Sequence, residues 1–320
     1  MSHAWTIDQI ASCIPDQTGR RVIVTGANSG IGYPTALELA RKGAQVVLAV
    51  RNPEKGAAAV ARINQVIGAP RAELSQLDLA SLSSIRAFAA RELARNAVLD
   101  LLINNAGVWS PPKRLETTDG FELQFGTNVL GHFALTALLL PALERASASD
   151  TAQPPRIVTV ASIAHKHGRI HFTDLQYQGG YSPQKVYSQS KLANLMLSFE
   201  LDRRLRARGS RILAVAAHPG VANTNLFQAG NYGPAEKAFR RWAGQAIGLL
   251  LNSDTQGALP TLYAATAPEA ASGAYYGPQG FQEMRGGDVG PSLIADHARE
   301  AAASARLWQI CEDLTGTGLL

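Results

Sequence analysis

The stretch T-G-A-N-S-G-I-G, residues Thr25 to Gly32, decides the fold of this chain. It follows a short apolar run and opens a helical pattern that continues to Lys42. Its glycines, at positions 26, 30 and 32, allow a strand to turn tightly into a helix while backbone N–H groups approach a pyrophosphate. Because the motif stands between a strand and a helix, dinucleotide binding is favoured over an ordinary glycine-rich turn.

Outward from this motif, short β-rich apolar runs alternate with longer helical patterns. We expect strands at 22–25, 45–50, 72–77, 98–103, 156–160, 212–216 and, more weakly, 274–276. We expect helices at 31–42, 53–66, 82–96, 121–145 and 185–208. This alternation predicts an α/β fold, a Rossmann-type doubly wound parallel sheet of about seven strands covered on both faces.

The chain is expected to form a single domain, because no repeat, low-complexity tract or linker interrupts the series. That domain covers residues 19–320, and residues 1–18 form an N-terminal arm whose Ile7, Ile10 and Ile14 lie on the core. Two excursions, at 163–183 and 221–255, follow strands at the edge where open α/β sheets bind ligands.

The second excursion, 221–255, is expected to be a substrate lid. Its larger apolar side chains would line a lipophilic substrate site, or they would pack on the core or on a second subunit, and helical spacing does not distinguish these. They are Leu226, Phe227, Tyr232, Phe239 and Trp242. The neighbouring basic residues, Lys237, Arg240 and Arg241, fit a solvated lid face better than membrane contact.

Composition narrows the class of protein. The formal net charge of +5 comes from dispersed basic residues, so nucleic-acid binding is not indicated. The chain has 2 cysteines, Cys13 and Cys311, which excludes a disulfide framework and fits a reducing cytoplasm. The opening residues show no secretory signal pattern, and the longest apolar runs fall short of the roughly 20 residues that a membrane span needs. A cytoplasmic protein without a membrane span is expected.

The candidate catalytic residues lie in the second half of the sheet. Tyr187 and Lys191 are one helical turn apart, which would let a fixed positive charge favour the phenolate. Ser162 ends the fifth strand, and Asn128 lies in an apolar helix where its amide must be bonded. A Tyr/Lys pair alone usually means a solvated lysine beside a partly buried ring, so this pair indicates catalysis only in combination with the other motifs.

Three histidines, His165, His167 and His171, follow Ser162. They would suit a metal, but no acidic or cysteine partner stands at ligand spacing. We interpret them as loop residues, with His165 near the substrate, and expect no metal.

The ordered motifs resemble the short-chain dehydrogenase/reductase family from about Gly19 to the C-terminal helix. The shared motifs are T-G-x-x-x-G-x-G at 25–32, N-N-A-G at 104–107, Asn128 in G-T-N-V-L-G-H-F, Ser162, Y-x-x-x-K at 187–191 and H-P-G at 218–220. Within the family, A-V-R-N-P-E-K-G, S-x-A-H-x-x-G-R-I-x-F and Y-x-x-S-K-L-A-N resemble the branch of retinol dehydrogenases and light-dependent protochlorophyllide reductases. The missing N-terminal anchor weighs against retinoid specificity, and the lack of cysteines near the site weighs against a photoenzyme.

The resemblance implies an oxidoreductase (EC 1.1.1.-) that interconverts a ketone or aldehyde and an alcohol. In it, Tyr187 acts as general acid/base and Ser162 orients the carbonyl. Lys191 bonds the nicotinamide ribose and lowers the pKa of Tyr187, and Asn128 holds a water linked to Lys191. The cofactor-binding residues would be Gly26, Asn28, Ser29, Gly30, Ile31, Gly32, Arg51, Asp78, Leu79, Asn105, Ala106, Gly107, Tyr187, Lys191, Pro219, Gly220, Val221 and Thr224.

Arg51 points to NADP(H) rather than NAD(H). It follows the second strand, where an acid would accept hydrogen bonds from a ribose 2′-hydroxyl, and its guanidinium suits a 2′-phosphate. The alternative is a surface arginine that caps the next helix. Asp78 resembles the aspartate that meets the adenine, or it belongs to a helix N-terminal turn. Asn104 and Gly107 would lie next to the cofactor, although asparagines there mostly satisfy backbone groups of neighbouring strands.

The predicted activity is therefore NADP(H)-dependent reduction or oxidation of a small, lipophilic carbonyl or alcohol. The alternative is a non-catalytic dinucleotide-sensing or scaffold protein, which the complete set of Asn128, Ser162, Tyr187 and Lys191 disfavours. An epimerase or dehydratase would usually show T-G-x-x-G-x-x-G instead. The family often pairs subunits through the helices that carry Asn128 and Tyr187, so a homodimer or homotetramer is possible.

Overall fold

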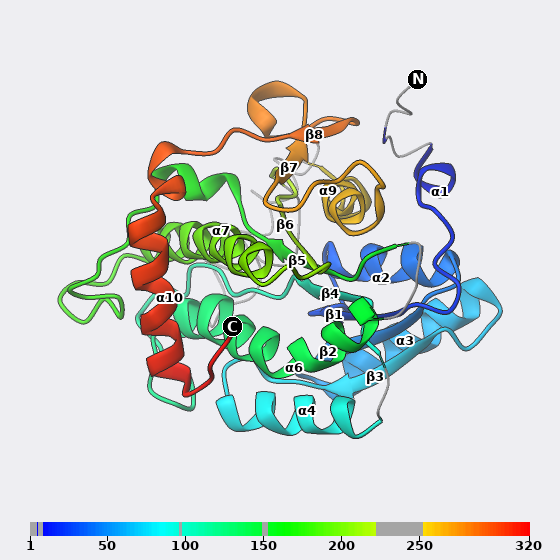
Figure 1. The fold of residues 1–320 in the computed structure, drawn as a ribbon, viewed down its shortest axis with the longest axis horizontal. Helices are drawn as coiled ribbons and strands as arrows, with labels where there is room; N and C mark the ends of the chain where they lie inside the picture. Colours follow the sequence, from blue (N-terminus) through cyan, green and yellow to red (C-terminus); the bar gives the residue numbers. More distant parts are fainter. Residues whose placement is uncertain (1–4, 6–8, 96–97, 149–152, 222–251) are drawn as a thin grey trace, which may run out of the picture.

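An eight-stranded sheet forms the centre of the molecule (Figure 1), in a computed structural model that describes residues 5, 9–95, 98–148, 153–221 and 252–320. The strand order is β3-β2-β1-β4-β5-β6-β7-β8, and the pairs are parallel except β7 with β8. The strands are β1 Arg21–Thr25, β2 Gln45–Val50, β3 Ala72–Gln76, β4 Leu101–Asn104, β5 Arg156–Val160, β6 Leu213–Ala217, β7 Tyr275–Pro278 and β8 Val289–Pro291. The predicted α/β, Rossmann-type architecture is confirmed.

Helices cover both faces of the sheet (Figure 1). One face carries α4, α6 and α7 with α10 outside them, and the other carries α2, α3 and α9. The helices are α1 Ile10–Cys13, α2 Gly32–Arg41, α3 Pro53–Ile67, α4 Leu82–Ala94, α5 Leu123–Phe125, α6 Gly131–Ala148, α7 Pro183–Ala207, α9 Asp254–Thr266 and α10 Ala301–Thr315.

The alternation of side chains along β1 explains the two hydrophobic cores. Ile23 joins the core beneath α4, α6 and α7, whereas Val22 and Val24 join the core beneath α2 and α9. Because successive side chains of a strand point to opposite faces, a strand buried on both sides must be a continuous apolar run. The strands could be predicted from the sequence because they are continuous apolar runs.

The N-terminal arm lies on the core, as predicted, through Ile14, which is 1% exposed. Trp5 adds an unpredicted contact, since its ring meets the ring of Tyr263 in α9 edge-on at 5.2 Å. Ile7 lies outside the described residues.

The predicted helix over 121–145 is interrupted at Asn128. The segment begins as α5, passes through a π-helical turn at Gly126–Leu130 and continues as α6. A π-turn inserts one residue into the helical ladder and often marks a functional site. Strand β4 begins at Leu101 rather than at residue 98, and the N–H of Leu99 donates to the carbonyl oxygen of Ala142 in α6 at 3.1 Å instead of to a neighbouring strand. Strand β8 was not predicted.

The segment Leu123–Ala148 is long and apolar enough to cross a membrane by length and composition, with a mean hydropathy of 1.4 over its best window. The lengths of the uninterrupted apolar runs had predicted no segment long enough for a membrane span. However, 83% of that window is buried inside the fold, as in a core helix, so the helix is weak support for a span.

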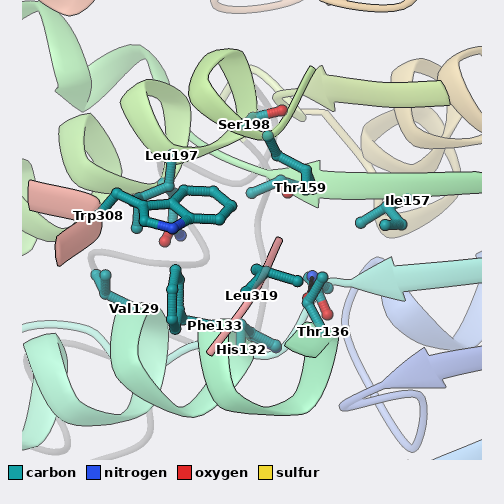
Figure 2. A pocket seen from close by; sticks show the side chains of 13 residues that line it. Val129, His132, Phe133, Thr136, Ile157, Thr159, Leu197, Ser198, Trp308 and Leu319 are labelled. Carbon is teal, nitrogen blue, oxygen red and sulfur yellow. Dashed lines mark hydrogen bonds between the residues drawn. The ribbon is translucent and has the colours of Figure 1, made fainter. Parts of the chain in front are cut away.

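Helix α10 lies across α6 and α7. The ring of Trp308 meets Phe133 of α6 edge-on at 5.1 Å (Figure 2). The guanidinium of Arg204 in α7 lies 4.5 Å from the centroid of the indole ring. Subunit pairing through α6 and α7 would therefore have to use the parts of these helices that α10 leaves open.

A cavity of about 40 Å³ lies where these three helices meet the sheet (Figure 2). Its lining includes His132 and Thr136 of α6, Ser198 of α7 and Trp308 of α10. None of the four candidate catalytic residues lines it, so it is distinct from the expected crevice.

Candidate active site

The glycine turn leaves no room for side chains. Gly26 has φ +67° and Gly30 has φ +54°, the left-handed region that favours glycine. A Cβ on Gly32 would lie 2.5 Å from Asn105 Nδ2 and 2.7 Å from the carbonyl oxygen of Gly26. Ile31, the residue before α2, gives the first helical turn no side-chain cap. This close approach of strand, turn and uncapped helix fits a pyrophosphate at the N-terminus of α2.

The N-N-A-G turn after β4 is tied to the end of β1 by Thr25. The hydroxyl Oγ1 of Thr25 accepts hydrogen bonds from the backbone N–H groups of Asn105 and Ala106, both at 2.9 Å. Asn105 Nδ2 donates to the carbonyl oxygen of Thr25 at 2.7 Å. The interpretation that these asparagines satisfy a neighbouring strand is therefore confirmed for Asn105.

The side chain of Asn104 contacts α6, and its position next to the cofactor stays a prediction. Its Nδ2 donates to Thr136 Oγ1 of α6 at 2.9 Å, and its side chain lines the cavity beneath α10. Alternation along β4 turns the Asn104 side chain to the face that α6 covers, so Asn104 supports α6, whereas Asn105 braces β1.

Asn128 is fully buried and bonded, as its place in an apolar helix required. Its Oδ1 accepts from the N–H of Val108 at 2.8 Å, and its Nδ2 donates to the carbonyl oxygen of Val108 and to Ser190 Oγ, both at 3.0 Å. Ser190 Oγ in turn donates to the carbonyl oxygen of Tyr187 at 2.8 Å. Asn128 thus connects the segment after N-N-A-G to the helix of Tyr187.

Helix α7 places Tyr187 and Lys191 beside the end of β5. The Lys191 ammonium lies 5.8 Å from the centroid of the Tyr187 ring and donates to the carbonyl oxygen of Val160 at 2.9 Å. The Tyr187 side chain is hydrogen-bonded to that of Ser162. Gly107 completes the group, because a Cβ there would lie 3.3 Å from Asn128 Oδ1 and 3.7 Å from Lys191 Nζ. The four candidate catalytic residues therefore meet at one site.

The pKa shifts of Tyr187 and Lys191 differ from expectation. Burial raises the pKa of Tyr187 to about 12, and the hydrogen bond with Ser162 only opposes this shift. Burial also lowers the pKa of Lys191 to about 8. Desolvation disfavours both charged forms, so without a bound cofactor the pKa of Tyr187 is raised rather than lowered, contrary to the expectation. Tyr187 is a protonated phenol near neutral pH.

The segment that follows Ser162 is held by residues from the C-terminal part of the chain. The carbonyl oxygen of Ser162 lies 2.7 Å from His165 Nδ1, and the His165 ring meets Tyr275 of β7 edge-on at 5.3 Å. Lys166 Nζ donates to Glu283 Oε2 at 2.6 Å. His165 is 0% exposed and bonded to Ser162, which gives it a supporting position behind that serine, and its place near the substrate stays a prediction.

The turn after β6 is fixed to the same C-terminal segment. Gly220 has φ +69°, and a Cβ there would lie 2.4 Å from the carbonyl oxygen of Met284. The N–H of Val221 donates to that oxygen at 2.7 Å, and Asn252 Nδ2 donates to the carbonyl oxygen of Pro219 at 3.1 Å. Thr224 and most of the predicted lid, including its aromatic and basic side chains, lie outside the described residues.

Arg51 and Asp78 lie at the carboxyl ends of β2 and β3, farther along the same edge of the sheet. Arg51 is exposed, and Asn52 rather than Arg51 caps α3, since its Oδ1 accepts from the N–H of Lys55 at 2.9 Å. Asp78 Oδ1 accepts from the N–H of Ala80 at 2.9 Å, which places it in the turn before α4. The helix-turn alternative for Asp78 is thus seen, and a contact with adenine stays a prediction.

Several residues of the site were not predicted. Thr25, Ser190 and Val160 supply its internal hydrogen bonds, and the Trp109 ring lies edge-on to Tyr187 at 6.3 Å. Only Trp109, which follows N-N-A-G directly, could have been suspected from its position. Within the described ranges, no group of three or more His, Cys, Asp or Glu side chains is placed to hold a metal ion.

Comparison with known proteins agrees with this geometry. Residues 20–233 match the family model of the short chain dehydrogenases. Mouse polyprenol dehydrogenase is 42% identical, with 95% of this chain and 86% of that protein covered, and human retinol dehydrogenase 11 is 39% identical, with 93% and 86% covered.

Solved structures agree as well. An uncharacterised protein of Mycobacterium paratuberculosis is 40% identical with a TM-score of 0.77, covering 99% of this chain and 100% of that one. An NAD(P)-dependent gluconate 5-dehydrogenase of Beutenbergia cavernae, solved with bound NADP, is 26% identical with a TM-score of 0.61, covering 81% and 95%. The glycine turn, the assembled Asn, Ser, Tyr and Lys, and these similarities together establish that the chain belongs to the short-chain dehydrogenase family and is related to its retinol dehydrogenases.

Proposed function

We propose that this protein interconverts a lipophilic ketone or aldehyde and its alcohol with NADP(H), and that Tyr187 moves the proton. The observation that carries the proposal is the hydrogen-bonded pair of Tyr187 and Ser162, with the Lys191 cation 5.8 Å from the phenol ring. A bound nicotinamide dinucleotide supplies or accepts the hydride.

In the proposed carbonyl reduction, Tyr187, Ser162 and Lys191 have different roles. Tyr187 is protonated near neutral pH and can donate that proton to a carbonyl oxygen. Burial raises its pKa to about 12 and so makes it a weaker acid, and the hydrogen bond with Ser162 opposes this shift. The Ser162 hydroxyl, bonded to the phenol, is placed to stabilise the oxyanion that develops there. Lys191 supplies positive charge that favours the phenolate left behind, and in the oxidative direction Tyr187 takes the proton back.

The chain's own residues fit NADP(H). The end of β2 carries the exposed guanidinium of Arg51 and no acid, and capping of α3 by Asn52 leaves Arg51 available to a 2′-phosphate. Gly26, Gly30 and Gly32 admit the pyrophosphate by the close approach described above. Equal turnover with NADH and NADPH would contradict the role of Arg51.

A lipophilic substrate is supported by the site and by the relatives. The Trp109 ring borders Tyr187, and the related proteins are named for polyprenol and retinol, which are long apolar alcohols. The N–H of Asn252 donates to the carbonyl oxygen of Val221 at 3.0 Å, so the intervening segment starts and ends beside the site. This supports a lid at 221–255. We further propose a cytoplasmic location, which rests on the two free cysteines.

The test is a turnover screen of lipophilic ketones, aldehydes and secondary alcohols with NADPH and NADH side by side, using wild type and Tyr187→Phe. We expect Tyr187→Phe to lower kcat by about 100-fold or more while the Kd for NADPH is unchanged. Tyr263→Phe, on the opposite face of the sheet, is the matched control and should keep full activity. Nucleotide binding without turnover of any substrate would instead favour a dinucleotide sensor.

A further inference from the structure

His132 lies buried between the two halves of the candidate site, on the first turn of α6, and is 5% exposed. Its Nδ1 is 3.1 Å from the carbonyl oxygen of Asn128, within the π-helical turn. Its Nε2 is 2.9 Å from Thr25 Oγ1 at the end of β1. The imidazole therefore bridges the helix that presents Asn128 and the strand that begins the glycine turn (Figure 2 shows its place beside Phe133 and Thr136).

Counting hydrogens fixes the form of the imidazole. The carbonyl oxygen of Asn128 can only accept, so Nδ1 carries the hydrogen. Thr25 Oγ1 already accepts from Asn105 and Ala106, which uses both of its lone pairs. Its single hydrogen can reach His132 Nε2 at 2.9 Å or the carbonyl oxygen of Ile103 at 3.3 Å, and the shorter contact favours donation to Nε2. A second hydrogen on Nε2 would face a hydroxyl with no acceptor left, and burial independently lowers the pKa of His132 to about 4. His132 is the neutral Nδ1–H tautomer.

A directed chain of hydrogen bonds follows from this tautomer. The N–H groups of Asn105 and Ala106 donate to Thr25 Oγ1, Thr25 donates to His132, and His132 donates to the carbonyl oxygen of Asn128. The chain has one direction when the Thr25 hydroxyl donates to the nearer acceptor, His132 Nε2, because the imidazole then has one donor and one acceptor.

We propose that His132 is a positioning residue that couples the backbone of the N-N-A-G turn, on the cofactor side, to the π-helical turn of Asn128, on the proton-transfer side. This inference rests on the proposed function for its catalytic meaning, but the coupling itself is a property of the fold. Both ring nitrogens of the buried His132 contact the protein itself, so it acts through Thr25 and Asn128.

The test is a double-mutant cycle. His132→Phe fills the space but removes both hydrogen bonds, and it is combined with Thr25→Val, which removes the hydroxyl, or with Thr25→Ser, which keeps it. Kd for NADPH is measured by tryptophan fluorescence, kcat and KM by turnover, and stability by the urea midpoint. We expect His132→Phe to weaken NADPH binding by about tenfold in the wild-type and Thr25→Ser backgrounds and by less than about twofold in Thr25→Val.

A second substitution, His132→Asn, separates the two ends of the bridge and serves also if His132→Phe does not fold. Its shorter amide can donate to the carbonyl oxygen of Asn128 but does not reach Thr25. We expect NADPH binding weakened as in His132→Phe, with kcat retained within about threefold because only one hydrogen bond is lost. A general loss of structure would lower both together.

Equal effects of His132→Phe in the Thr25→Val and Thr25→Ser backgrounds would overturn the inference, as would unchanged NADPH binding in His132→Phe. Wild-type protein that binds neither NADPH nor NADH would overturn the proposed function instead. In that case the coupling is read from the urea midpoints, where non-additive losses for His132 and Thr25 support the bridge and additive losses refute it.

Discussion

Lys191 Nζ donates a 2.9 Å hydrogen bond to the carbonyl oxygen of Val160, which fixes the cation against the last residue of β5. The ammonium is thereby held 5.8 Å from the centre of the Tyr187 ring in a buried site. The position is costly, because burial lowers the pKa of Lys191 from 10.5 to about 8.

The cost of this buried charge predicts a pH dependence of stability. Between pH 8 and 10 the unfolded chain binds more protons at Lys191 than the folded protein does, so the free energy of unfolding rises with pH. Lys191 should contribute a rise on the order of 2 to 3 kcal/mol over this window. Urea unfolding at several pH values should show the rise in wild type and in Lys185→Met, an exposed lysine of the same helix, and its loss in Lys191→Met.

Gly32→Ala should disable nucleotide binding. The new Cβ would lie 2.5 Å from Asn105 Nδ2 and 2.7 Å from the carbonyl oxygen of Gly26, so the turn or the N-N-A-G segment must move. We expect the Kd for NADPH to rise by about tenfold or more, since overpacking of this kind costs about 1 to 3 kcal/mol. Gly287→Ala, where a Cβ meets nothing within 4 Å, should bind normally by isothermal titration.

Trp109 should influence which substrates turn over. Its ring lies edge-on to Tyr187 at 6.3 Å and restricts space beside the phenol. Trp109→Ala should lower kcat/KM for small ketones by about 3- to 10-fold, the value of an aromatic pair, and should lower it less for bulky ones. The kcat/KM of Trp109→Phe for each substrate should lie between the values for Trp109→Ala and wild type. Trp5→Phe, which is remote from the site, is the control. An equal loss of kcat/KM for all substrates in Trp109→Ala would contradict a role in specificity.

Acid should destabilise the protein through its buried histidines. Burial lowers the pKa of His218 to about 3 and that of His132 to about 4, so below pH 6.5 the unfolded chain binds protons that the folded protein does not. Each histidine should lower the free energy of unfolding by up to about 1.4 kcal/mol per pH unit as the pH falls from 6.5 to 5. His218→Asn should show a shallower slope, whereas the exposed His167→Asn should match wild type.

The sheet could be predicted because parallel strands buried on both faces must be apolar throughout. Val22–Thr25 and 45–50 are such runs, and the structure places them within a residue of expectation. Strand β8 consists of Val-Gly-Pro and has no such pattern, because its pairing depends on the hairpin that returns it to β7. The π-turn at Asn128 depends on bonds to Val108 and Ser190, which are distant in sequence.

The candidate catalytic residues could be predicted from the sequence, but the residues that hold them in place could not. Ser162, Tyr187 and Lys191 stand at recognisable spacings, and the structure brings them together. Thr25 and His132 carry no signal of their own, since a threonine at a strand end and a histidine in an apolar helix are common. The direction of the Tyr187 pKa shift was wrong because one-turn spacing gives the nearby charge and omits the desolvation that outweighs it.

The support of Ser162 by the C-terminal hairpin changes how a truncated gene product should be judged. A protein ending soon after residue 233 would still contain every family motif and the full matched region. It would lack Tyr275, which packs on His165 behind Ser162, and Glu283, which holds Lys166. Genome annotation by motif would count such a fragment as an enzyme, although the loop that follows the proposed catalytic serine would have lost the residues that fix it.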